Sequence, residues 1–436
     1  MARDGVVPAA VGVDRGVERC RSGRLDCSWT DAGPATAVWA GRACRSAGDR
    51  YTLLLLSSHV AAVYGIDVWL IRRLGKRAMK ITAIHAVQRV RHLTRPMRNA
   101  QGESDRRRFT FVIVETDAGV TGIGDAFGDP LLMPTIIERR LAPAAIGLDP
   151  LDIETLWRRL FASGSFWETA GSVVCGISAI EVACWDIRGK HDGLPVCELL
   201  GGRKRDRVEA YASDLHWEEP QQMAELARDY LERGFRFVKT HIGAAGQHDN
   251  DLRRCEAIRE AIGPDVGFLI DINTAFDRQT ALARGRELEA FDPFWYEEPL
   301  SPLDYQGHAQ LRQELSMKVS TGENLYLTEG FQPLWAVNAC DYVMPDILRC
   351  GGLRQAQQIC RDAVAHGVIP SPHNFSSGVG LAATLHLMAA QIDTELLEFD
   401  PTGTAIYEEM FIEPLGVADG MVEVPSGPGL GIRFDV

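Results

Sequence analysis

The stretch VGFLIDIN, residues 266–273, decides the fold, because an apolar half typical of a buried strand ends in the polar residues Asp271 and Asn273. Seven other runs have this form, and helical patterns separate them at about 27 residues per repeat, enough for one strand, one helix and two short loops. The seven runs are VEAYASD (208–214), FRFVKTHIG (235–243), FWYEEP (294–299), KVSTGEN (318–324), YVMPDI (342–347), VIPSPHN (368–374) and LLEFD (396–400). Eight such strands predict an α/β protein with a TIM-like barrel over residues 207–400.

The segment before the barrel, residues 79–206, combines strand and helix patterns. KITAIHAVQRVRHL (80–93) alternates like a strand, and RRFTFVIVETDAGVTGIGDAF (107–127) has the pattern of two strands around a turn at residues 117–119. Three helical patterns follow, in PTIIERRLAPAAIG (134–147), DIETLWRRLFA (152–162) and GISAIEVACWDIRGKHDG (176–193). We therefore expect an α+β domain of ordinary size in front of the barrel.

Composition excludes several classes of protein. The 436 residues are 46% hydrophobic and 24% charged, the balance of a soluble globular protein and not of a disordered or fibrous chain. The net charge of −13 leaves no broad basic face for phosphate backbones or anionic lipid, so we expect neither a nucleic-acid nor a membrane partner. The ten cysteines include no CxxC pair and lie mostly in apolar runs, which indicates reduced core thiols in a cytoplasmic protein.

Residues 1–78 do not fit the rest of the chain. They carry twelve basic and seven acidic side chains, with no helical or strand period before residue 51. The apolar segment 51–71 is interrupted by His59 and Asp67 and is short of a membrane span. We expect a disordered or non-native extension, such as translation from a start codon placed too far upstream, with the working protein beginning at Met79. The alternative is a regulatory arm.

Polar and ionisable residues gather at the C-terminal ends of the predicted strands, where barrel active sites are built. Besides Asp271 and Asn273, they are Lys239, His241, Glu297, Glu298, Glu323, Asn324, Asp346, His373 and Glu398. Asp271, Glu297 and Glu323 come from three consecutive strands and would converge as three oxygen ligands. Such a set suits Mg²⁺, with Mn²⁺ as a substitute, and does not suit zinc.

A single residue of this kind usually has a simpler explanation. An isolated acid at a strand end is most often a solvated carboxylate or the N-cap of the following helix, and a histidine such as His373 is most often a structural residue. These explanations fail for the whole set, because so many ionisable groups on one rim would repel one another without a cation. The set therefore predicts a divalent metal site.

These segments, in their order along residues 79–436, resemble the enolase superfamily, and within it the mandelate racemase and muconate lactonizing enzyme-like subgroup. The resemblance rests on AIEVACWDIRGK (179–190), KTH (239–241), LIDIN (269–273), WYEEP (295–299), TGEN (321–324), MPDILRCGG (344–352), SPH (371–373), LEF (397–399) and PSGPGLGI (425–432). It implies a (β/α)7β barrel with an α+β N-terminal capping domain at residues 79–206. It also implies that a C-terminal tail, residues 401–436, returns to the capping domain.

The resemblance implies roles for the strand-end residues. Mg²⁺ would be bound by Asp271, Glu297 and Glu323. His373 and Asp346 match a catalytic dyad, and Glu398 would lie near the substrate carboxylate. One departure concerns the second strand, where the subgroup usually carries Lys-x-Lys and this chain has Lys239 followed by His241. A histidine can still accept a proton there, but it reaches a different volume, so the stereochemical course is the property that changes.

The predicted reaction is Mg²⁺-dependent removal of the proton α to a carboxylate through an enolate intermediate, because a divalent ion stabilises the charge that develops. We expect Lys239 to offset the excess negative charge, with His241 and His373 flanking the α-carbon. Dehydration of a sugar acid to a 2-keto-3-deoxy acid is the first hypothesis. A cycloisomerase, racemase or epimerase of a sugar acid or lactone is the alternative. A noncatalytic barrel that binds a metabolite is the second alternative.

The substrate is expected to be a small carboxylate, held partly by two capping loops. These loops are HLTRPMRNAQGESDRRR (92–108) and GDAFGDPLLM (124–133), and the first carries Arg95, Arg98, Arg106 and Arg107, which could hold a second carboxylate or hydroxyl groups. We expect substrate contacts from Arg98, Asn273, Glu298 and Asn324. No residue is assigned to an organic cofactor, and the resemblance implies a homo-oligomer.

Overall fold

The computed structural model describes residues 79–403, 406–413 and 415–433. The expected extension, residues 1–78, lies outside the described residues, as do the last three residues of the tail. Among the helices of the described part, none combines the length and the apolar character needed to cross a bilayer.

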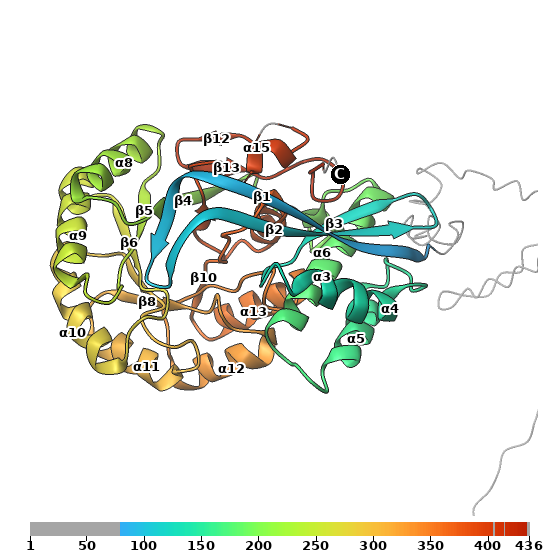
Figure 1. Ribbon diagram of the computed structural model, residues 1–436, viewed down its shortest axis with the longest axis horizontal. Helices are drawn as coiled ribbons and strands as arrows, with labels where there is room; N and C mark the ends of the chain where they lie inside the picture. Colours follow the sequence, from blue (N-terminus) through green and yellow to red (C-terminus); the bar gives the residue numbers. More distant parts are fainter. Residues whose placement is uncertain (1–78, 404–405, 414, 434–436) are drawn as a thin grey trace, which may run out of the picture. The chain divides into compact units, whose positions relative to one another are not determined.

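The capping domain begins with a three-stranded antiparallel sheet in the order β1-β2-β3 (Figure 1). Its strands are β1 (Ile81–Asn99), β2 (Gly102–Thr116) and β3 (Thr121–Asp125). The helical segments are α3 (Met133–Thr135), the π-helical η1 (Ile136–Leu141), α4 (Ala142–Ala145), α5 (Ile153–Gly164), α6 (Ser172–Asp192) and α7 (Val196–Leu199). The three strand patterns and the three helical patterns predicted for this segment are thus confirmed. Helix α6 ends where Gly193 adopts the left-handed conformation that a glycine C-cap provides.

The expected capping loop at residues 92–108 is wrong, because these residues form the ends of a long hairpin. Strands β1 and β2 stay paired up to Asn99 and Gly102, and only Ala100 and Gln101 form the turn. The register shifts between His92 and Met97, so the segment containing Pro96 bulges out of the ladder. Proline and charged residues suggested a loop, but an exposed hairpin tolerates both at such an irregularity.

The barrel follows with the eight strands that the sequence predicts. They are β4 (Arg207–Leu215), β5 (Phe237–His241), β6 (Gly267–Asp271), β7 (Trp295–Glu297), β8 (Lys318–Thr321), β9 (Tyr342–Val343), β10 (Ile369–Pro370) and β11 (Leu397–Phe399). Strands β4 to β10 are neighbours in chain order, all parallel, and β11 pairs in parallel with β4. The backbone N–H of Glu395 donates to the carbonyl of Pro370, which links β11 to β10.

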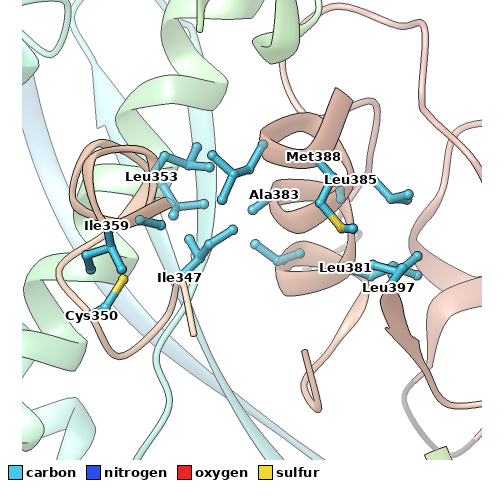
Figure 2. Packing of buried hydrophobic residues seen from close by; sticks show 14 of the residues in the cluster. Ile347, Cys350, Leu353, Ile359, Leu381, Ala383, Leu385, Met388 and Leu397 are labelled. Atoms are coloured by element: carbon cyan, nitrogen blue, oxygen red, sulfur yellow. The ribbon is translucent and has the colours of Figure 1, made fainter. Parts of the chain in front are cut away.

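Helices between the strands surround the barrel (Figure 1). They are α8 (Pro220–Glu232), α9 (His248–Ile262), α10 (Arg278–Leu288) with the short η2 (Glu289–Phe291), α11 (Tyr305–Glu314), α12 (Leu327–Val337), α13 (Leu353–Ala365) and α14 (Gly378–Ala390). Figure 2 shows one part of the core between these layers, where Leu353 of α13 and Ile347 lie on the side toward α14 and Ile359 lies near Cys350. Because Ile347 is buried there, the preceding residue Asp346 is fixed at the barrel rim.

A plug of large side chains fills the barrel interior. It consists of Tyr211, Leu269, Trp295, Tyr342, Met344 and Leu396, all buried. The ring of Trp295 meets those of Tyr211 and Tyr342 at centroid distances of 5.5 and 5.2 Å. Residues two apart on a strand share a face, so Leu269 and Trp295 lie below Asp271 and Glu297. The plug therefore supports the polar strand ends from beneath and keeps water away from them.

Buried acids of α6 hold the capping domain on the barrel. Glu181 accepts hydrogen bonds from the backbone of Leu353 at 2.9 Å, from the backbone of Arg354 at 3.2 Å and from the Trp185 indole at 2.8 Å. Burial raises the pKa of Glu181 to about 7, although these donors favour its ionised form. The acid inside AIEVACWDIRGK, Glu181, therefore connects the capping domain to the start of α13 in the barrel.

The C-terminal tail contacts both parts of the fold. It contains α15 (Tyr407–Met410), β12 (Val417–Ala418) and β13 (Met421–Glu423), and β13 pairs antiparallel with the first half of β4. Further on, the backbone N–H of Leu430 donates to Asp186 of α6 at 3.0 Å. The tail thus reaches the capping domain, as the resemblance implies.

The cysteines of the described residues fit the expected reduced thiols. Seven are present, and each is buried and unpaired. They are Cys175, Cys184, Cys197, Cys255, Cys340, Cys350 and Cys360.

We predict that Glu181→Ala destabilises the protein by roughly 2–4 kcal/mol, because it leaves buried N–H groups without an acceptor. Denaturant unfolding followed by tryptophan fluorescence measures this loss. Glu154→Ala is the matched control, since Glu154 pairs only with exposed arginines from α5 and α13. Equal unfolding midpoints for the two variants would contradict the assigned role of Glu181.

Candidate functional site

Lys239 lies at the centre of the polar strand ends. Its ammonium group is 2.5 Å from Glu297 Oε1, 2.8 Å from Glu398 Oε1 and 3.8 Å from Asp271 Oδ2, and the residue is 1% exposed. Burial disfavours the charged amine, but Glu297 and Glu398 more than offset this and hold the pKa of Lys239 well above its usual value. One buried cation therefore joins β5, β6, β7 and β11, as expected for a residue that offsets the acidic excess.

His241 stands on the same face of β5 and contacts β6. Its Nδ1 is 3.1 Å from Asp271 Oδ2 and 3.2 Å from Asn273 Oδ1. Asn273 in turn donates to both oxygens of Asp271 through its backbone N–H and its side-chain amide, each at 2.8 Å. With Nδ1 engaged, Nε2 is the atom of His241 that is left to react, and it is buried without a hydrogen-bond partner.

The acids of β7 and β8 contact one another through amide donors. Glu298 accepts from Asn324 Nδ2 at 2.6 Å and from the backbone N–H of Gly322 at 3.3 Å. The same Asn324 amide reaches Glu323 Oε1 at 3.2 Å. Burial, followed by the nearby charge of Glu323, raises the pKa of Glu298 to about 8.

Asp346 and His373 form the expected pair on β9 and β10. His373 Nδ1 is 2.7 Å from Asp346 Oδ2, and the backbone N–H of Leu348 donates to Asp346 Oδ1 at 2.7 Å. His373 Nε2 is 3.1 Å from Glu323 Oε2 and 3.4 Å from Glu398 Oε2. Burial disfavours the imidazolium, but the charges of Glu323 and Glu398 and the Asp346 hydrogen bond raise the pKa of His373 to about 10.

Glu398 connects the two sides of the site. It accepts from Lys239, from Ser213 Oγ at 2.5 Å and from the backbone N–H of Asn374 at 3.1 Å. Burial opposes its ionisation, yet Lys239 and His373 hold its pKa below the usual value. Glu398 is thus a fixed anion between the cation of β5 and the histidine of β10.

The donor chemistry of the three predicted metal ligands fits a hard divalent cation. Asp271, Glu297 and Glu323 offer only oxygen, are at most 7% exposed, and Asp271 lies opposite Glu297 in the β6–β7 register. Burial, and after it the charges of neighbouring acids, raise the pKa of Glu297 well above normal despite Lys239. Among the described residues, however, no group of three His, Cys, Asp or Glu side chains forms a ready coordination cage. The three carboxylates are turned instead toward Lys239, His241 and His373, so their role as ligands stays a prediction.

Sequence reasoning missed Arg349, which sits between the β8 and β9 acids. Its guanidinium is 3.7 Å from Glu323 and 3.6 Å from Asp346, and it lies over the ring of Phe127 at 3.8 Å. Phe127 belongs to the predicted capping loop 124–133, so this loop does reach the barrel rim. The position of Arg349 within MPDILRCGG, three residues after Asp346, was the available signal.

The arginines of the β1–β2 hairpin have different surroundings. Arg98 pairs with Glu103 at 3.0 Å and Glu218 at 3.8 Å. Within the described residues it makes no ion pair with the acids at the strand ends. Arg107 is buried and pairs with Asp400 at 3.0 Å. It also donates to the Phe375 carbonyl at 3.0 Å and lies over the Phe375 ring at 4.2 Å. Arg107 thus connects the capping domain to the segments that follow His373 and Glu398.

The tip of the hairpin lies over the end of β6. The Gln101 amide donates to the carbonyl of Asn273 at 2.5 Å and to Thr274 Oγ1 at 3.3 Å. Beside this contact is a cavity of about 540 Å³ lined by the tip and by residues of the β5–α9 and β6–α10 connections. The capping domain therefore touches the residues that orient Asp271.

Comparisons with known proteins show which family the chain is similar to. The sequence model described as "Mandelate racemase / muconate lactonizing enzyme, N-terminal domain" matches residues 81–201, and "Enolase C-terminal domain-like" matches residues 222–436. A D-galactarolactone cycloisomerase of Agrobacterium fabrum is 33% identical, over 82% of this chain and 97% of its own length. An arabinonate dehydratase of Saccharolobus solfataricus is 31% identical, over 73% of this chain and 86% of its own length.

Solved structures show the same likeness. The crystal structure of the 3,6-anhydro-D-galactonate cycloisomerase from Zobellia galactanivorans superposes with a TM-score of 0.75 at 33% identity. The match covers 82% of this chain and 97% of that one.

We predict that Lys239→Met lowers the free energy of unfolding by roughly 3–5 kcal/mol when divalent ions are chelated, because removal of one partner leaves buried carboxylates unpaired. Denaturant unfolding in the presence of EDTA measures the change. Lys318→Met on β8 is the control, since Lys318 is exposed and makes no ion pair within the described residues. If both lysine variants unfold at the same denaturant concentration, the ammonium group of Lys239 does not compensate the charges of Glu297 and Glu398.

Proposed function

This chain belongs to the mandelate racemase and muconate lactonizing enzyme family of the enolase superfamily, and from that premise we propose that it dehydrates a sugar acid to a 2-keto-3-deoxy acid. The observation that carries the proposal is the placement of two histidines, His241 and His373, at the rim of one barrel around Lys239 and a set of buried acids. Relatives named as dehydratases act on sugar acids, including arabinonate and xylonate.

The proposed metal site is Mg²⁺ held by Asp271, Glu297 and Glu323, with Mn²⁺ as a substitute. When bound there, the ion would supply positive charge to the oxygens of the substrate carboxylate and lower the energy of the enolate. The buried all-oxygen donors support this assignment.

The proton steps belong to the two histidines. His241 is held through Nδ1 by Asp271 and Asn273, so its Nε2 accepts the proton from the α-carbon. His373 is held through Nδ1 by Asp346, so its Nε2 donates a proton to the departing β-hydroxyl, which leaves as water. The enol that remains takes up a proton at the β-carbon and becomes the 2-keto acid.

Lys239 and Glu398 position the reacting groups. Lys239 holds Glu297 and Glu398 in place and supplies a fixed positive charge near the developing enolate. Glu398 faces Nε2 of His373, where it favours the protonated histidine that the second step requires. Asn324 and Glu298 complete the rim on β7 and β8 and are proposed to contact the substrate, with Arg98 and Asn273.

A second candidate is favoured by one specific observation. The cycloisomerase of Agrobacterium fabrum matches this chain over nearly all of its length, and a solved cycloisomerase superposes on the same two domains. A cycloisomerase would use the same α-proton removal on a lactone and release no water. We propose it as the alternative, and we propose in either case a small-molecule carboxylate or its lactone as substrate and a homo-oligomeric cytoplasmic enzyme.

We predict that the purified protein with Mg²⁺ forms a 2-keto acid from at least one sugar acid, and that His373→Asn lowers kcat by about a thousandfold, the usual size of a general acid–base contribution. Asp346→Asn is expected to lower kcat by about 10–100-fold, because His373 then loses the carboxylate that orients its ring. A semicarbazide assay for 2-keto acids measures both. His366→Asn, at the exposed end of α13, is the control.

The same experiment separates the two candidates. The mass of the product distinguishes them, because a dehydratase gives a keto acid that is lighter than its substrate by one water, whereas a cycloisomerase opens the ring of its lactone and gives an isomer of unchanged mass. Turnover that survives in His373→Asn would show that the pair of His373 and Asp346 is not the proton donor.

We predict that Mg²⁺ stabilises the protein, by about 2.7 kcal/mol at a concentration one hundred times its Kd, and that Asp271→Asn and Glu323→Gln abolish this gain. Thermal unfolding with and without MgCl₂ measures it, and isothermal titration calorimetry measures Mg²⁺ binding directly. Glu287→Gln on α10, half-exposed and outside the site, should respond like the unaltered protein. Undiminished Mg²⁺ binding by Asp271→Asn would remove Asp271 from the ligand set.

A further inference from the structure

A second histidine lies against His241, at the end of β4. The rings of His216 and His241 stack with centroids 4.7 Å apart and an interplanar angle of 11°. The ring of Phe375, two residues beyond His373, meets His216 at 6.0 Å and 73°. His216 therefore stands between the segments that carry the two proposed proton-transfer histidines.

Polar atoms around this stack are buried without hydrogen-bond partners. His216 is 8% exposed, and both of its ring nitrogens lack a partner, as does Nε2 of His241. Asp214 Oδ1 is only 2.7 Å from His216 Nε2, but the pair does not form a hydrogen bond of acceptable geometry. Buried polar atoms in folded proteins almost always have partners. His216 Nδ1 has neither a hydrogen bond nor an ion pair within the described residues, which indicates that a polar ligand supplies its partner.

A cavity of about 110 Å³ adjoins this place and is lined by Asp214 and His216. Its other wall is the bulge of β1, which contributes Thr94, Arg95, Pro96 and Met97, and Glu218 and Thr402 also line it. A single water needs about 10–15 Å³ of such space, so the cavity has room for several polar atoms. Of its lining residues, His216 is the one whose ring stacks on His241.

The lining suits hydroxyl groups better than a second carboxylate. Arg95 and His216 can donate hydrogen bonds, whereas Asp214 and Glu218 can only accept them when ionised. A second carboxylate would face these two acids, and only Glu218 has an arginine partner, Arg98 at 3.8 Å. A hydroxyl group can donate to Asp214 and accept from Arg95 at once.

We propose that Arg95, Asp214 and His216 form a subsite for the distal hydroxyl groups of a sugar acid with a single carboxylate. This inference rests on the proposed function and narrows its substrate class to aldonates, excluding aldarates, which carry a carboxylate at each end. His216 is then a substrate-binding residue whose ring also sets the plane of His241. The subsite joins the barrel to the β1 bulge, so it exists only where the capping domain is docked.

The first test compares substrates in the unaltered protein with Mg²⁺. A six-carbon aldonate and the aldarate of the same configuration are the probes, and kcat/KM is the readout. The aldonate is expected to be turned over at least about tenfold more efficiently, because the aldarate places a carboxylate against Asp214 and Glu218. A preference for the aldarate overturns the subsite and leaves the proposed function standing, whereas absence of turnover and binding for every sugar acid overturns both.

The second test measures binding in the His373→Asn background, where no turnover disturbs it. His216→Phe retains the stacked ring and removes both nitrogens, so calorimetry should show about tenfold weaker binding of the aldonate and little change for glycerate, whose three carbons end before the cavity. Asp214→Asn is the second variant. It should bring the affinity for the aldarate closer to the affinity for the aldonate, because one of the two acids that repel the second carboxylate is then neutral. His308→Phe removes another buried histidine, on α11, and should change neither affinity. Equal losses for the aldonate and glycerate in His216→Phe would show a positioning role alone and overturn the proposal.

Discussion

The burial of like charges at one end of the barrel is the constraint on which the rest of the structure depends. Glu297 and Glu398 are almost fully buried and both touch the ammonium group of Lys239. Two unit charges about 4 Å apart interact by roughly 4 kcal/mol at an effective dielectric constant of 20, so each uncompensated repulsion there is comparable with a large share of a protein's net stability. The aromatic plug beneath and the capping domain above keep the dielectric constant low. The same exclusion of water that makes the acids costly makes them strong ligands and strong orienting groups for a substrate.

Contacts between the two domains reach directly into this charged rim. Arg107 pairs with Asp400 just beyond Glu398, and Phe127 stacks on Arg349 beside Asp346. A third contact comes from α6, where Glu181 accepts hydrogen bonds from backbone N–H groups at the start of α13. The barrel supplies the groups for chemistry, while the capping domain supplies charges and rings that hold those groups in register. The polar rim of the barrel and the capping domain are therefore physically connected in this fold.

The sequence predicts most of the fold because its signals are local. Each barrel strand has an apolar half before a polar end, and strand alternation places Lys239 and His241 together without knowledge of the structure. Longer-range features were not predictable in the same way. Pairing of β13 with β4 joins residues more than two hundred positions apart, and the paired tip of the β1–β2 hairpin contradicts its loop-like composition. The sequence offered no such signal for His216, whose stacking on His241 is seen only in the structure, whereas Arg349 had a local signal in its position three residues after Asp346.

The paired tip of the hairpin also bears on the geometry of the acids beneath it. A ribbon whose two strands are paired up to its tip is stiffer than a loop of the same length, which would sample many shapes. Its anchor is the Gln101 amide on the backbone of Asn273, so lifting the ribbon disturbs the residue that orients Asp271. The position of the ribbon and the geometry of the acids are thus mechanically linked. Substitutions that change the stiffness of this ribbon can therefore alter the orientation of Asp271 while every side chain of the barrel rim is retained.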